Sequence, residues 1–190
     1  MMEKVAAGID IGGTKIALAL ETLEGEKAVS RRIPTRVEIG AQAIARNIAR
    51  TLAEMAEQSQ TEIISIGIGC PSPLDIEKGL VMSPSNLRDW DRFPIVRFFE
   101  ERFNAPVVLE NDANTAALGE FVYGAGRGYK NVVYITVSTG IGGGSLLTAK
   151  FITVLRRARA NSDTPLFSST AYAATAAQSA VWKRFAPEFI

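Results

Sequence analysis

Apolar residues in the first part of the chain fall into short runs that are separated by glycine or polar turns. The first run covers residues 5–9 and ends in Asp10, and a second run covers residues 16–20 after a pair of glycines. Two such runs on either side of a glycine turn predict a β-hairpin. We expect this hairpin, with a third strand near residues 28–33, to open a sheet.

The pattern then changes to helical spacing. Apolar side chains recur three and four positions apart over residues 41–55, which predicts an amphipathic helix of about four turns. Strands and helices alternate after it. The expected strands cover residues 63–68, 106–109 and 132–137, and the expected helices cover residues 94–103 and 111–123. This order predicts an α/β fold in which helices flank a mixed sheet.

Two regions depart from this alternation. Residues 70–86 are rich in proline, serine and glycine, and we expect a loop there that is too long to be a simple connector and is a candidate functional loop. After Gly144, an arginine-rich stretch leads into an Ala/Ser/Thr-rich segment without period or caps, for which we predict no stable fold. The expected organisation is therefore one lobe at residues 1–144 and a divergent segment at residues 145–190.

The charge and the residue composition of the chain exclude several classes of function. The net charge of +1 gives no strong field to attract nucleic acid or an anionic membrane. The chain shows no apolar run of about 18 residues and no signal peptide, so we expect a cytoplasmic protein. It has no histidine and one cysteine, Cys70, which excludes an internal disulfide and histidine-based acid–base chemistry and fits a reducing compartment.

The expected hairpin turn, with the sequence GIDIGGTK, is the first candidate for chemistry. Gly12 and Gly13 allow backbone N–H groups to approach phosphate oxygens, Thr14 adds a hydroxyl donor, and Lys15 adds a positive charge. Asp10 at the strand end is placed to hold Mg²⁺ through water, because Mg²⁺ keeps much of its hydration. The alternative is an ordinary tight hairpin with an exposed lysine. The pattern is neither a P-loop nor a Rossmann fingerprint, because its glycines open a hairpin and not a helix.

A second glycine-rich motif, TVSTGIGGG, follows the strand expected at residues 132–137. We expect another glycine turn there, with serine and threonine hydroxyls as phosphate donors. Two such turns about 125 residues apart, each after a strand, suggest two arms that grip one polyphosphate. The candidate nucleotide-binding residues of this second turn are Thr139, Gly140, Gly142 and Gly143.

The third motif, LENDANTAALGE, covers a strand-to-helix junction. Asp112 lies at the end of the sheet where open α/β sheets bind ligands. Its carboxylate, ionised at neutral pH, can accept the proton of a sugar hydroxyl that attacks a γ-phosphate. Asn111 could fix a neighbouring hydroxyl. The alternative, which is compatible with catalysis, is that Asn111 or Asp112 caps the following helix.

Taken together and in order, these motifs resemble the N-terminal half of the ROK family (repressors, ORFs and sugar kinases), and most of all its bacterial glucokinase branch. The resemblance covers residues 4–144 and includes GIGCPSPLD and SPSN, which are similar to the family's G-x-P-G-P-x-D and P-N. It implies the actin-like ATPase (ribonuclease H-like) fold. It also implies ATP-dependent phosphorylation of a hexose, glucose to glucose 6-phosphate first, with an N-acetylhexosamine or fructose as the alternative substrate.

The resemblance also implies roles for single residues. Asp112 corresponds to the catalytic base and Asn111 to a sugar-binding residue, while the two glycine motifs correspond to the ATP site, with Mg²⁺ at Asp10. Asn86 and the loop that contains Ser72 fall where the family contacts or shapes the sugar pocket. Ser72 stands where the family more often has glycine.

Residues 145–190 lack the family's next motifs, G-E-x-G-H and a cysteine-rich zinc loop, so we expect no structural zinc site in this chain. Moving the reading frame back by one nucleotide allows residues 149–164 to encode GKIYHGAAAGAGEFGH, a version of the missing motif. We therefore interpret the segment as the product of a frameshift near codon 145.

Several expectations follow for the chain as written. Without a second lobe we expect negligible kinase activity and an exposed apolar surface, in a family whose members are often homodimeric. ROK repressors carry a winged-helix DNA-binding domain ahead of the hairpin, and a hairpin that starts at Val5 leaves no room for one, which favours a kinase. A non-catalytic sugar- or nucleotide-binding module and a pseudogene product remain the alternatives.

Overall fold

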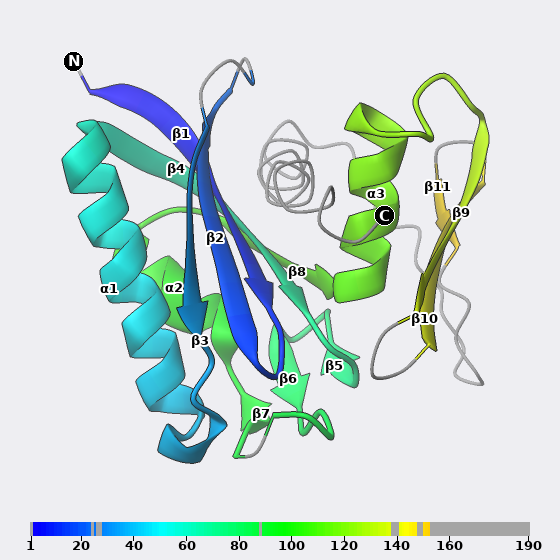
Figure 1. Cartoon of the computed structure of the whole chain (residues 1–190). Coiled ribbons are helices and arrows are strands. Elements are labelled where there is room, and N and C mark those ends of the chain that lie inside the picture. The colour runs from blue at the N-terminus through cyan, green and yellow to red at the C-terminus, as the bar shows by residue number, and fades with distance from the viewer. Residues whose placement is uncertain are drawn as a thin grey trace.

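The structure, a computed structural model, describes residues 2–23, 25, 28–87, 89–137, 141–147 and 150–152. Its largest unit is a five-stranded mixed sheet with the strand order β3-β2-β1-β4-β8 (Figure 1). The strands are β1 (Glu3–Ile11), β2 (Lys15–Thr22), β3 (Ala28–Pro34), β4 (Thr61–Cys70) and β8 (Val107–Asn111). The first three strands form an antiparallel meander, and β4 and β8 run parallel to β1. The predicted hairpin and mixed α/β fold are confirmed.

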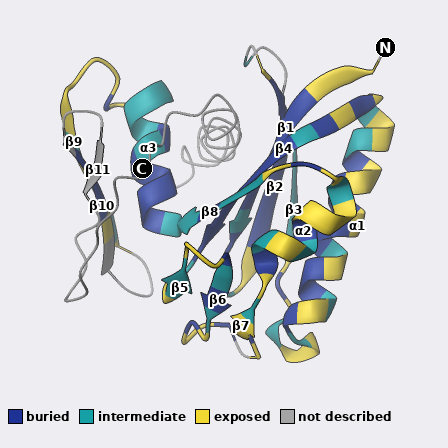
Figure 2. Cartoon of the chain, turned by 180° about the vertical axis from the view of Figure 1, so that it is seen from behind, coloured by how far each residue is buried: buried dark blue, intermediate teal, exposed yellow. Residues whose placement is uncertain are grey.

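Helices lie on both faces of this sheet. They are α1 (Ala41–Ser59), α2 (Ile95–Phe103) and α3 (Asp112–Tyr123), with a short 3-10 turn η1 (Val37–Ile39) before α1. The predicted apolar positions of α1, from Ala41 to Met55, are all buried and join one core cluster with β1, β4 and α2. Figure 2 shows the buried residues along the sheet and on the inner side of α1. On the other face of the sheet, α3 begins directly at the end of β8 (Figure 1).

The segment between β4 and α2 is not the long loop that its composition predicts. It contains a small antiparallel sheet of β5 (Leu74–Asp75), β6 (Leu80–Met82) and β7 (Asp91–Phe93). Val81 and Trp90 are buried, and the Trp90 ring packs edge-on against Phe93 with centroids 5.3 Å apart. Strands of two or three residues are too short to show alternation, which is why the sequence pattern missed them.

A third sheet follows α3. It consists of β9 (Asn131–Val137), β10 (Ile141–Leu147) and β11 (Lys150–Ile152), and α3 packs against β9 and β10. Gly142, Gly143 and Gly144 lie inside β10 and pair with β9, so the prediction that these glycines form a turn is wrong. Gly144 has a packing reason for being glycine, since a Cβ there would lie 2.7 Å from the backbone oxygen of Ala113 in α3.

Strands β10 and β11 continue past Gly144, where the sequence places the end of the lobe. That boundary stays a prediction. The predictions for residues 153–190 lie outside the described residues. The interpretation of a frameshift near codon 145, based on residues 149–164, also stays a prediction. No helix in the described part of the chain is long and apolar enough to cross a membrane.

Candidate active site

The carboxyl ends of the three parallel strands meet at one edge of the large sheet. In the register of these strands, Asp10 of β1 lies opposite Gly69 of β4, which lies opposite Glu110 of β8. One position further along, Cys70 lies opposite Asn111. This edge is where open α/β sheets bind ligands. The fold therefore brings the hairpin turn and the Asn111–Asp112 pair, about 100 residues apart in the chain, to the same edge.

The hairpin turn after Asp10 is fixed by hydrogen bonds from both strands and from the end of β3. The backbone N–H of Gly12 donates to the oxygen of Lys15 at 3.0 Å, and a Cβ on Gly12 would lie 2.8 Å from that oxygen. Thr35, which is buried, donates its hydroxyl to the oxygen of Gly12 at 2.6 Å and its N–H to the oxygen of Thr14 at 3.0 Å. Sequence reasoning missed Thr35, because nothing in its local pattern distinguishes it.

The tip of this hairpin contacts the segment that carries Asn86. A Cβ on Gly13 would lie 3.1 Å from Cβ, and 3.2 Å from Nδ2 and from the backbone oxygen, of Asn86. Both residues were predicted for the site on separate grounds, one for the phosphates and one for the sugar. The structure adds that they are neighbours, with Thr14, Lys15 and Asn86 exposed around the turn.

Asn111 connects three segments of the site. Its Oδ1 accepts the N–H groups of Ala113 at 3.0 Å and Asn114 at 3.3 Å, so the expectation that Asn111 caps the helix is confirmed. Its Nδ2 donates to Oγ of Ser72 and to Oδ1 of Asp112, both at 3.0 Å. Ser72 thus accepts a hydrogen bond from Asn111.

Asp112 is fixed through one of its two oxygens. Oδ1 accepts the N–H of Ala113 at 2.8 Å as well as Nδ2 of Asn111. Burial raises the pKa of Asp112 above its ordinary value, and these two hydrogen bonds act against the rise. A carboxylate of this kind is a better proton acceptor than an exposed aspartate, because its pKa is closer to neutral pH.

Asp10 shares this acidic environment. Burial, and then the charge of Asp112, raise the pKa of Asp10 to about 7, against a lowering effect of Lys15. The same two carboxylates, after burial, raise the pKa of the Cys70 thiol. Among the described residues, no group of three or more acidic, histidine or cysteine side chains is arranged to hold a metal ion. The role of Asp10 in holding Mg²⁺ through water stays a prediction; a cation there would offset the negative charge of Asp10 and Asp112.

The second glycine-rich motif is only partly described. Thr139 and Gly140 lie outside the described residues. Gly142 and Gly143 pair with Thr136 and Ile135 in the β9–β10 ladder. The roles of these four residues in nucleotide binding stay predictions.

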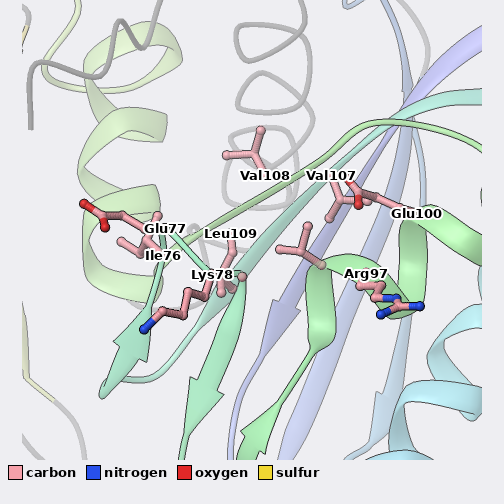
Figure 3. Close-up of a pocket in the computed structure, with 10 residues that line it drawn as sticks. Ile76, Glu77, Lys78, Arg97, Glu100, Val107, Val108 and Leu109 are labelled. Atoms are coloured by element: carbon pink, nitrogen blue, oxygen red, sulfur yellow. The ribbon is translucent and has the colours of Figure 1, made fainter.

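A recess of about 360 Å³ lies elsewhere, between α2, β8 and the β5–β6 turn (Figure 3). None of the predicted site residues lines it. Lys78 and Arg97 at its rim point away from each other in Figure 3. Each pairs with a carboxylate of its own segment, Lys78 with Asp75 at 3.1 Å and Arg97 with Glu101 at 2.6 Å. The two cationic side chains that line the recess are therefore already paired within their own segments.

Comparisons with known proteins identify the family. The ROK family model matches residues 6–155. A glucokinase of Halalkalibacterium halodurans is 39% identical over 147 residues, which are 76% of this chain and 44% of the relative. The solved structure of a ROK family glucokinase from Streptomyces griseus in complex with glucose and AMPPNP superposes with a TM-score of 0.68 at 36% identity. That superposition covers 82% of this chain and 47% of that chain.

A similar share of the chain also matches proteins of other functions. An N-acetylmannosamine kinase of Shigella boydii is 37% identical, over 76% of this chain and 48% of the relative. A xylose repressor of Bacillus spizizenii is 35% identical, over 74% of this chain and 36% of the relative. The chain spans about half the length of the curated relatives that it matches, or less.

Proposed function

The chain belongs to the ROK family, and we propose that it carries the nucleotide-binding and proton-accepting half of an ATP-dependent hexose kinase. The observation that carries the proposal is the geometry of Asp112. Its hydrogen bonds with Asn111 and Ala113 both go to Oδ1, so neither of them occupies Oδ2. The carboxylate lies at the sheet edge that also presents the Gly12–Gly13 turn.

In this proposal Asp112 accepts the proton of a sugar hydroxyl as that oxygen attacks phosphorus. Asn111 orients the carboxylate through Nδ2 and lies beside the same hydroxyl-binding region. Backbone N–H groups of the hairpin turn bind phosphate oxygens, and Asn86, against Gly13, brings a sugar-binding residue next to them. When bound, Mg-ATP supplies the phosphoryl group, and Asp10 is the residue that would hold the cation through water.

Glucose is the proposed substrate. The support is the similarity to glucokinases, including one whose structure contains glucose and AMPPNP. N-acetylmannosamine is the second candidate, supported by the Shigella boydii relative. We also propose a reducing, cytoplasmic setting, which agrees with the buried free thiol of Cys70.

A hybrid enzyme tests the proposal. Residues 1–144 of this chain are joined to the C-terminal half of the Halalkalibacterium halodurans glucokinase, and ADP release is measured with a panel of hexoses. We expect glucose-dependent turnover, and a fall in kcat of about 10²- to 10⁴-fold on Asp112→Asn, because a general base is lost. Glu77→Gln, at an exposed position outside the site, is the matched control and is expected to leave kcat unchanged.

The result also separates the alternatives. An Asp112→Asn hybrid that keeps its kcat contradicts the role of the base. In parallel, the 190-residue chain is titrated with glucose and with Mg-ATP. If the chain binds these ligands but the hybrid releases no ADP, the chain is a non-catalytic binding module and not half of a kinase.

A further inference from the structure

Glu110 is a carboxylate beside the candidate base to which the sequence motifs assign no role. It precedes Asn111 in β8 and is half-buried. Its position in the strand register places it in one row with Gly69 and Asp10, and residues in one row of a parallel sheet project from the same face. Glu110 therefore projects from the face that also carries Asp10, and it meets the first turn of α3.

One oxygen of Glu110 fixes the junction between β8 and α3. Oε1 accepts the backbone N–H of Asn111 at 2.8 Å and Nδ2 of Asn114 at 2.9 Å. Asn114 is only 4% exposed, so without Glu110 its amide would be a buried donor that has lost this partner. Leaving a buried donor unsatisfied is destabilising, because the donor has lost water without gaining a protein partner.

The two hydrogen bonds extend to Asp112 through a closed set of contacts. The backbone N–H of Asn114 donates to Oδ1 of Asn111 at 3.3 Å. This contact turns the other end of the Asn111 amide, Nδ2, toward Oδ1 of Asp112 at 3.0 Å. Glu110 and Asn114 thus fix the backbone and the side chain of Asn111, which in turn orients Asp112.

We propose that Glu110, acting with Asn114, is a positioning residue that holds Asn111 in the orientation in which it fixes the carboxylate of Asp112. The effect on catalysis rests on the proposed function, whereas the positioning of Asn111 and Asp112 does not. The position of Oε1, and not the negative charge of Glu110, is what holds Asn111, because this one oxygen accepts both hydrogen bonds. Glutamine can present the same oxygen to both donors, whereas alanine cannot.

The first test measures the pKa of the Asp112 carboxyl by NMR in the 190-residue chain. The hydrogen bond from Asn111 lowers this pKa. In Glu110→Ala and in Asn114→Ala we expect the pKa to rise by about 0.5–1 unit, since that hydrogen bond is lost. Removing the negative charge of Glu110 would by itself lower the pKa of Asp112. A rise in this pKa therefore indicates that the hydrogen bond from Asn111 is lost, and a fall indicates that only the charge is lost. Glu110→Gln is expected to produce no rise.

The second test measures kinetics in the hybrid enzyme. Displacement of a catalytic group by about 1 Å can cost on the order of 100-fold in rate. We expect Glu110→Ala to lower kcat by about 10- to 100-fold with the KM for ATP unchanged, and Glu110→Gln to retain most of the activity. Asn114→Ala is expected to resemble Glu110→Ala, and the double variant is expected to be no worse than either, because the two residues act as a unit.

Defined outcomes overturn the proposal. An unchanged pKa of Asp112 in Asn114→Ala, which removes no charge, or effects on kcat that multiply in the double variant, would show that the pair does not position the base. An equal loss of activity and of melting temperature in Glu110→Gln and Glu110→Ala would indicate a purely structural role. If Glu110→Ala does not fold, Asn114→Ala and Glu110→Gln decide the matter by the same measurements. The proposed function is judged separately, by Asp112→Asn.

Discussion

Gly144 and Ala113 are in backbone contact. A Cβ on Gly144 would lie 2.7 Å from the backbone oxygen of Ala113, and 3.0 Å from both Cβ of Ala117 and Cα of Asn114. Strand β10 therefore crosses the start of α3 at a distance that only glycine allows. The last residue of a motif that suggests phosphate binding from sequence serves to dock the helix that begins with the candidate base.

Replacing Gly144 should destabilise this packing. We expect Gly144→Ala to lower the free energy of unfolding by about 1–3 kcal/mol, since the clash is with backbone atoms that cannot move aside. Urea unfolding followed by circular dichroism measures the change. The neighbouring substitution Gly143→Ala is the control, because a Cβ there meets only the oxygen of Tyr134 at 3.1 Å. An equal loss in both variants would argue against the specific contact with α3.

Gly13→Ala should affect nucleotide and sugar together. The new Cβ would press on Asn86 and move the hairpin tip away from the segment that carries this candidate sugar-binding residue. In the hybrid enzyme we expect the KM values for ATP and for glucose to rise by about 10-fold each, on the scale of 1–2 kcal/mol of strain. If only the KM for ATP changes, the contact between Gly13 and Asn86 does not link the two sites.

The stability of the chain should depend on pH through Asp10. Its pKa is raised from 3.8 to about 7 in the folded state, so the folded state binds more protons than the unfolded state between these two values. Stability contributed by the protonated form is therefore lost as the pH rises through that window. We expect Asp10→Asn to be more stable than the parent above pH 7, by roughly 2–4 kcal/mol, and the difference to vanish below about pH 4. Thermal unfolding across this range measures the effect, and a difference that is independent of pH would contradict it.

The outer face of β9 should promote self-association. Val133, Ile135 and Val137 alternate along the strand and are 69%, 66% and 74% exposed. Exposed apolar surfaces of this kind favour association in water. We expect the chain to show concentration-dependent sedimentation, and the triple threonine variant at these positions to sediment as a monomer. Val29→Thr, at another exposed apolar position, serves as the control and should not change the behaviour.

Regular periodicity made the main elements predictable. The hairpin around Gly12 and the helix that buries Ile44, Ile48 and Leu52 follow from local spacing alone. Contacts between distant segments have no such signal. The hydrogen bond from Asn111 to Ser72 joins residues 39 positions apart, and the hydroxyl of Thr35 reaches Gly12 across 23 positions. The motifs named most of the candidate site residues, but the bonds that orient them come from tertiary structure.

The register of the parallel strands also restricts how this gene can change length. Asp10, Gly69 and Glu110 occupy one row across β1, β4 and β8. Side chains alternate between the faces of a strand, so inserting or deleting one codon inside any of the three would carry its end residue to the opposite face. Length variation among homologues should therefore concentrate in the connections, such as the turn near Gly25, and be absent from these strands.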